Sequence, residues 1–93
     1  MKKEIKTMSI KAAAKWVAET QEKICAVIHE PWYYGYGPGS EEMFYEEENE
    51  ALLCLEEAII SNPKELETFK PAYWREESIM NEMIAKLKKE GKI

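Results

Sequence analysis

The residue types that most often carry out catalysis or bind metals are sparse in this sequence. His29 is the single histidine, and Cys25 and Cys54 lie far apart along the chain. Zinc sites require Cys or His at short spacings, and di-iron helical bundles require two Glu-x-x-His units, so neither site can be built. No serine lies in a Gly-x-Ser-x-Gly turn, and no glycine-rich phosphate loop precedes a predicted helix. We therefore predict no catalytic residue, no metal site and no cofactor. We expect that the protein is not an enzyme.

The segment of residues 30–40 contains the clearest binding chemistry. Its central nine residues, 31–39, include four aromatic residues and three glycines. Aromatic rings with a polar group give a large contact area and freeze only about two torsions each. They could stack on a base, a sugar or a proline of a partner, or fold back to cover a thin helical core with glycine permitting the turn. Both alternatives remain open. The candidate binding residues are Trp32, Tyr33, Tyr34 and Tyr36.

Negative charge is concentrated in the middle of the chain. Residues 31–62 contain eight glutamates and no Lys or Arg, whereas residues 1–30 and 63–93 have net charges of +2 and +1. Such clustering costs self-repulsion along a helix. It predicts an acidic face that docks on a basic partner; the alternative is a solvated helix face without a partner. Carboxylates one turn apart, ~5–6 Å, approach the spacing of backbone phosphates, so the partner could be a nucleic-acid-binding protein. The candidate docking residues are Glu41, Glu42, Glu46, Glu47, Glu50 and Glu57.

Two further glutamates are predicted to face inward. Glu48 falls on the apolar stripe of its helix, and a buried carboxylate needs a partner. In an antiparallel helix pair, Gln21 lies at about the same level, so we expect a hydrogen bond between Gln21 and Glu48. Glu76 also faces inward, but near the other end of the bundle. That separation argues against a carboxylate metal pair.

Length and composition limit the class of protein. Ninety-three residues with 45% hydrophobic and 33% charged content predict one domain, residues 1–93, in which residues 1–8 are a candidate for disorder. The net charge of -5 argues against direct nucleic-acid binding. The longest apolar run, residues 51–55, is far shorter than the ~20 residues that cross a bilayer, and we find no signal peptide. We therefore expect a cytoplasmic protein without membrane contact, with Cys25 and Cys54 as buried, reduced thiols.

Composition and periodicity both predict that helices position these residues. Asp is absent, and Gly and Pro number four each, so tight turns are few. The first helix is predicted at residues 10–28, capped by Ser9 and ended before Pro31. Its apolar stripe consists of Ile10, Ala13, Ala14, Val17, Ile24 and Ile28.

The second helix is predicted at residues 41–61, after a Ser40 cap. Leu53 and Ile60 project from the side opposite to the apolar stripe, which predicts a homodimer seam or packing by the loops. The inner stripe consists of Phe44, Ala51, Leu52, Leu55, Ala58 and Ile59.

Two more helices complete the predicted fold. Asn62, Pro63 and Glu65 have the spacing of a capped helix start, which predicts a short helix near residues 63–69. The last helix is predicted at residues 72–90 and ends at Gly91. Its stripe consists of Tyr73, Met80, Met83, Ile84 and Leu87. Together the elements predict an all-α fold, a small antiparallel three-helix bundle with one short extra helix.

The sequence favours a non-enzymatic protein–protein interaction module. Its acidic second helix and the adjacent aromatic loop would dock on a basic protein surface, as an inhibitor or adaptor. The alternative is an oligomeric small-ligand protein that binds or sequesters a nucleotide or metabolite through the aromatic loop. An anionic ligand would need nearby bases, for which Arg75, Lys15 and Lys23 are the candidates.

Overall fold

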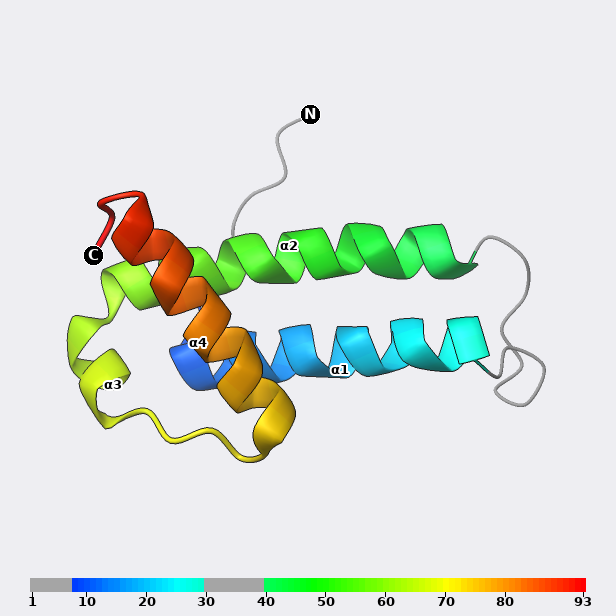
Figure 1. The fold of residues 1–93 in the computed structure, drawn as a ribbon, viewed down its shortest axis with the longest axis horizontal. Helices are drawn as coiled ribbons and strands as arrows, with labels where there is room; N and C mark the ends of the chain where they lie inside the picture. The colour runs from blue at the N-terminus through cyan, green and yellow to red at the C-terminus, as the bar shows by residue number, and fades with distance from the viewer. Residues whose placement is uncertain (1–7, 30–39) are drawn as a thin grey trace.

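The structure is a computed structural model that describes residues 8–29 and 40–93. These residues form four helices, α1 (Ile10–His29), α2 (Ser40–Ser61), α3 (Pro63–Thr68) and α4 (Trp74–Lys89), and no strand (Figure 1). The predicted small all-α bundle is confirmed, and each helix bound lies within two residues of its prediction. The predicted loop of residues 30–40 and the segment of residues 1–8 fall almost entirely outside the described residues.

The longest helices, α1 and α2, form an antiparallel hairpin and pack most extensively on each other. The shorter α4 lies obliquely across one end of this hairpin, near the start of α1 and the end of α2 (Figure 1). The short α3 lies in the connection between α2 and α4. Within the part of the chain that the structure describes, no helix covers the other half of the hairpin, which contains the end of α1 and the start of α2.

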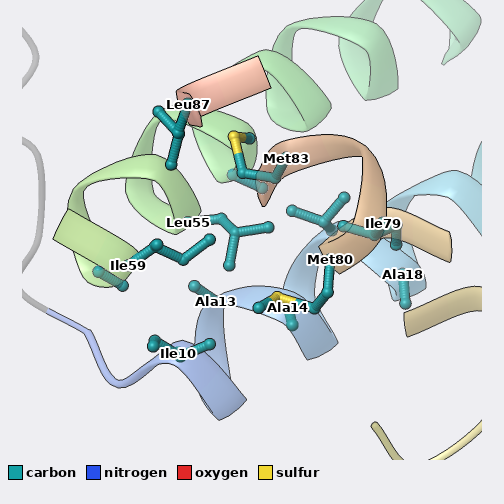
Figure 2. Packing of buried hydrophobic residues seen from close by; sticks show 13 residues of the cluster. Ile10, Ala13, Ala14, Ala18, Leu55, Ile59, Ile79, Met80, Met83 and Leu87 are labelled. Carbon is teal, nitrogen blue, oxygen red and sulfur yellow. The ribbon is translucent and has the colours of Figure 1, made fainter. Parts of the chain in front are cut away.

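One main hydrophobic core joins α1, α2 and α4 (Figure 2). Its largest fully buried side chains include Ile10, Leu55, Ile59 and Leu87. Small residues on both partners let α1 and α2 approach closely, and these are Ala13, Ala14, Ala18, Ala51 and Ala58. The predicted stripe of α1 is buried at every position whose side chain the structure describes.

The stripe predicted for α4 is only partly correct. Met80, Met83 and Leu87 are buried as predicted, but Ile79 is buried too, with 5% exposure. Tyr73 is 38% exposed, so its predicted place in the core is wrong. It precedes the helix with extended backbone angles, φ -162° and ψ 177°, and therefore does not follow the helical period.

A second, separate cluster lies in the uncovered half of the hairpin. It consists of Ile24 and Val27 of α1 and Phe44 of α2, each buried. Cys25 is exposed in this region, so the prediction of a buried Cys25 is wrong, while Cys54 is buried as predicted. Ala18, two turns earlier on the same face of α1, belongs to the main core that includes α4. Cys25 is exposed whereas Ala18 is buried, because α4 does not extend along the hairpin as far as Cys25.

The first turn of α1 is capped from two directions. The Ser9 Oγ accepts a hydrogen bond from the Ala12 amide at 3.1 Å, as predicted. The Glu65 carboxylate of α3 also binds this turn, because Oε1 accepts from the Ile10 amide at 2.9 Å and Oε2 from the Lys11 amide at 3.2 Å. A carboxylate at the positive end of the helix dipole is favourable. The short helix α3 therefore stabilises a helix that begins more than 50 residues earlier.

The predicted capping of α3 by its own residues is wrong. Asn62 makes no side-chain cap to α3. Its Nδ2 instead donates to the Ala58 carbonyl at 2.8 Å and so satisfies the end of α2. Glu65, which follows Asn62 at the spacing of a capping box, binds the start of α1. The spacing signals the helix start correctly, but the Asn62 side chain binds the preceding helix and the Glu65 side chain binds a helix distant in sequence.

The end of α4 follows the predicted glycine stop. Gly91 has φ +74°, a left-handed conformation that favours glycine. Its amide donates to the Lys88 carbonyl at 3.2 Å, and the Lys92 amide donates to the Leu87 carbonyl at 2.9 Å. These two hydrogen bonds form a Schellman motif, which satisfies the last carbonyls of the helix.

Candidate interaction surface

The outward face of α2 carries uncompensated negative charge. Glu42, Glu46 and Glu57 are exposed. Among the described residues, no Lys or Arg lies within ion-pair distance of these three carboxylates. We call these three residues the acidic row. They fall within one sector of the helix at ~100° per residue, so they point in a common direction away from α1.

Glu47 has a structural partner on α1. The Trp16 Nε1 donates to Glu47 Oε1 at 3.0 Å, and the Lys23 Nζ lies 3.7 Å from the same oxygen. The Lys23 Nζ also lies 5.6 Å from the centre of the Phe44 ring. These contacts hold α2 against α1 and use part of the hydrogen-bonding capacity of Glu47. Glu47 is therefore less available to a partner than the exposed Glu42, Glu46 and Glu57.

The other predicted docking residues are placed as follows. Glu50 is half-buried and takes part in an interaction. The side chain of Glu41 lies outside the described residues. The same holds for the four aromatic candidates, Trp32, Tyr33, Tyr34 and Tyr36. The predicted surface therefore reduces, within the described residues, to the acidic row and its apolar neighbours.

Two apolar side chains lie on the same face of α2 as the acidic row, Leu53 between Glu46 and Glu57 and Ile60 just after Glu57. Leu53 is 52% exposed and Ile60 is 39% exposed, as their position opposite the inner stripe predicts. Because seven residues are nearly two full turns, both project from the same face of α2. Their use as a homodimer seam stays a prediction. An exposed apolar pair bordered by carboxylates without a cationic partner among the described residues is the composition expected of a docking surface.

The predicted hydrogen bond between Gln21 and Glu48 is not formed. Both residues are half-buried, so solvent reaches Glu48 and no buried partner is needed. Glu76 is buried with 5% exposure, as predicted. Its Oε1 accepts a hydrogen bond from the Ala72 amide at 3.1 Å, just ahead of α4. Solvent contact therefore satisfies Glu48, and the hydrogen bond from the Ala72 amide satisfies Glu76.

A polar and aromatic cluster joins the start of α4 to α1. The Tyr73 hydroxyl donates to Glu22, and this hydrogen bond, together with burial, raises the pKa of Tyr73 to about 12. The Arg75 Nε lies 3.8 Å from Glu22 Oε1, and the Arg75 guanidinium lies 4.6 Å from the centre of the Trp74 ring. Sequence patterns did not indicate this cluster, because Glu22 lies 51 residues from Tyr73.

A groove of about 470 Å³ lies between α2 and α4. Its apolar lining comes from Leu52, Leu53, Ile79 and Met83. The polar residues that line it are Gln21, Asn49, Glu56, Glu82 and Lys86. Near one end, the Lys92 Nζ lies 2.6 Å from Glu56 Oε1 and ties the segment after α4 to α2. The groove was not predicted, because the oblique path of α4 creates it.

Metal chemistry and membrane insertion receive no support over residues 8–29 and 40–93. In these ranges, no group of three or more His, Cys or Glu side chains is placed to hold a metal ion. None of their helices combines the length and the apolar character that crossing a bilayer requires.

Comparison of the chain with models of protein families, with curated proteins and with solved structures finds no match in any of the three.

Proposed function

We propose that this protein is a non-enzymatic interaction module that docks on a basic protein through the outward face of α2. The observation that carries the proposal is the acidic row, Glu42, Glu46 and Glu57, exposed and without a cationic partner among the described residues. Leu53 and Ile60 lie within the same face and supply apolar contact area. Carboxylates that are not neutralised within the molecule remain available to attract a positive surface.

The arrangement fits electrostatic docking better than mere hydration. The acids of α1 and α4 have bases on the same helix, whereas α2 has none. A partner with Lys or Arg would relieve the repulsion within α2, and this relief adds to the attraction. Long-range attraction of this kind raises the association rate and falls as salt rises, because the Debye length shortens from ~30 Å at 0.01 M to ~3 Å at 1 M.

An inhibitor or adaptor is the form of module that these features support. Such a protein needs a stable scaffold and a charged face, and it needs no catalytic group. We also expect a cytoplasmic location, where the exposed thiol of Cys25 would stay reduced.

The test compares two triple variants of equal net charge. E42Q/E46Q/E57Q removes the acidic row, and E19Q/E67Q/E77Q removes three exposed glutamates of α1, α3 and α4. The probe is immobilised polylysine, and binding is measured by surface plasmon resonance at several salt concentrations. We expect the first variant to lose affinity by ~10-fold or more and the second by less than ~3-fold. Equal losses would mean that net charge alone governs binding, and this would overturn the proposal.

A further inference from the structure

The groove between α2 and α4 is a largely apolar site that residues 8–29 and 40–93 leave unfilled. Because α4 runs obliquely, its distance from α2 increases towards the uncovered half of the hairpin. The groove lies between these two diverging helices. Leu53 stands on its edge with 52% of its surface exposed. Methionine adapts its shape to different occupants, and Met83 belongs to the lining. These features are typical of a surface that receives apolar side chains from outside.

The groove leads directly into the acidic row. From Leu53 towards the start of α2, the residues on the same face are Asn49, Glu46 and Glu42, at steps of four, three and four residues. This path is ~16 Å long at ~1.5 Å per residue. Glu82 adds a carboxylate from the α4 wall, and Lys86 is the one base among the described residues that line the groove. An occupant of the groove that extends along α2 would therefore meet apolar surface first and negative charge next.

We infer that the groove and the acidic row bind a basic amphipathic helix of a partner protein, about three turns long. The inference rests on the proposed function and names its partner class. Apolar side chains at i, i+3 and i+4 of such a helix would enter the groove, while its Lys and Arg side chains would reach Glu42, Glu46 and Glu82. A helix in this place would pack beside both α2 and α4, as one helix of a bundle packs against its neighbours.

Charge argues against a second copy of this chain as the occupant. A symmetric pairing through the groove and the acidic row would bring two α2 faces together. The carboxylates of Glu42, Glu46 and Glu57 would then face acidic residues of the same kind, since α2 contains no base. Like charges across an interface cost binding energy, so the charge pattern selects a basic partner.

The experiment measures peptide binding to the full chain. The probe is a labelled peptide of about 14 residues, nearly four turns, with Leu on one helical face and Lys on the other. The control peptide has the same composition in a scrambled order that mixes both residue types around the helix. Leu53→Asn removes the apolar edge of the groove, and Ile93→Asn removes a comparable exposed aliphatic side chain outside both the groove and the docking face of α2. Fluorescence anisotropy gives the affinities, and methyl NMR follows Leu52, Ile79 and Met83.

We expect the amphipathic peptide to bind at least ~10-fold more tightly than the scrambled one, and to shift these methyl signals. Leu53→Asn should weaken binding by ~10-fold, whereas Ile93→Asn should change it by less than ~3-fold. Equal binding of the two peptides, or methyl signals that do not move, would overturn the inference. So would a dimer of the free protein that Leu53→Asn dissociates, because the groove would then belong to a second copy.

The two proposals fail in different ways. If the peptides bind equally but polylysine binding still depends on the acidic row, the groove inference fails and the proposed function stands. If E42Q/E46Q/E57Q weakens the binding of neither the amphipathic peptide nor polylysine, both proposals fail.

Discussion

The Glu65 carboxylate accepts a hydrogen bond from the Ile10 amide at 2.9 Å, across a sequence separation of 55 residues. Its second oxygen accepts from the Lys11 amide at 3.2 Å, so one side chain satisfies two of the free amides at the start of α1. This contact joins the short α3 to the first helix.

Glu65→Ala should therefore destabilise the whole fold. Loss of a helix cap costs ~0.5–2 kcal/mol, which corresponds to a fall in Tm of about 4–8 °C per kcal/mol for a domain of this size. Glu67→Ala, an exposed position on the same helix, is the matched control and should leave Tm nearly unchanged. Thermal unfolding followed by circular dichroism measures both. A Tm for Glu65→Ala equal to that of the control would show that the cap contributes nothing in solution.

Trp16 provides a second test of how α1 is held to α2. Trp16→Phe removes the indole donor to Glu47 and keeps most of the apolar surface. A hydrogen bond to a charged group contributes ~1.5–3 kcal/mol, part of which Lys23 will retain, so we expect a loss of ~1 kcal/mol in the free energy of unfolding. Trp74→Phe is the control, because Trp74 is 66% exposed. Urea denaturation should separate the two variants, and identical midpoints would count against the Trp16 to Glu47 bond.

Two leucines of α2, two positions apart, should respond very differently to the same truncation. Leu55 is fully buried and Leu53 is 52% exposed. Leu55→Ala should cost ~2–5 kcal/mol, because it removes buried apolar surface and leaves a cavity in the core. Leu53→Ala should change stability by less than ~0.5 kcal/mol. Chemical denaturation of both variants tests the register of α2, and a reversed order of stability would refute it.

Tyr73 should titrate well above an ordinary tyrosine. Its pKa is about 12 instead of 10.0, first because its hydroxyl donates to Glu22 and next because of burial. A raised pKa means that the folded state favours the neutral phenol. The stability that comes from this contact is therefore fully present below pH ~10 and is lost as the pH rises from ~10 to ~12.

The ultraviolet absorbance of phenolate measures this titration, as the difference between the natural protein and Tyr73→Phe. Glu22→Gln removes the negative charge of the acceptor and should return the pKa of Tyr73 towards 10. Glu19→Gln, an exposed position on the same helix, is the control. A Tyr73 pKa that is equally high in both variants would exclude Glu22 as the main cause.

The fold was predictable from the sequence where local signals decide it. Periodic apolar residues defined the buried stripes of α1 and α2, and Gly91 marked the end of α4. Prediction failed where a side chain binds a different partner from the one that its local spacing indicates. Glu65 and Asn62 matched a local cap but bind α1 and α2, and Glu48 has no partner in Gln21.

The candidate site was predictable in composition but not in shape. The excess of glutamate on α2 and the exposure of Leu53 and Ile60 follow from counting residues and helical angles. The hydrogen bond from Trp16 to Glu47 and the groove between α2 and α4 could not be predicted in this way, because both depend on how the helices pack on one another. Helical periodicity predicts which face of a helix a residue lies on. It does not predict how far along that helix a neighbouring helix extends.

The two clusters of buried residues divide the molecule into unequal cooperative units. Among the described residues, a small buried cluster of Ile24, Val27 and Phe44 lies in the half of the hairpin beyond α4, whereas the main core draws on three helices. Amide protons near residues 24–27 and 44–48 should therefore exchange with deuterium sooner than those near residues 13–17 and 55–59, through local opening that leaves the rest folded. A partner that binds along the start of α2 would slow this exchange, so its affinity and the local order of the hairpin would be thermodynamically linked.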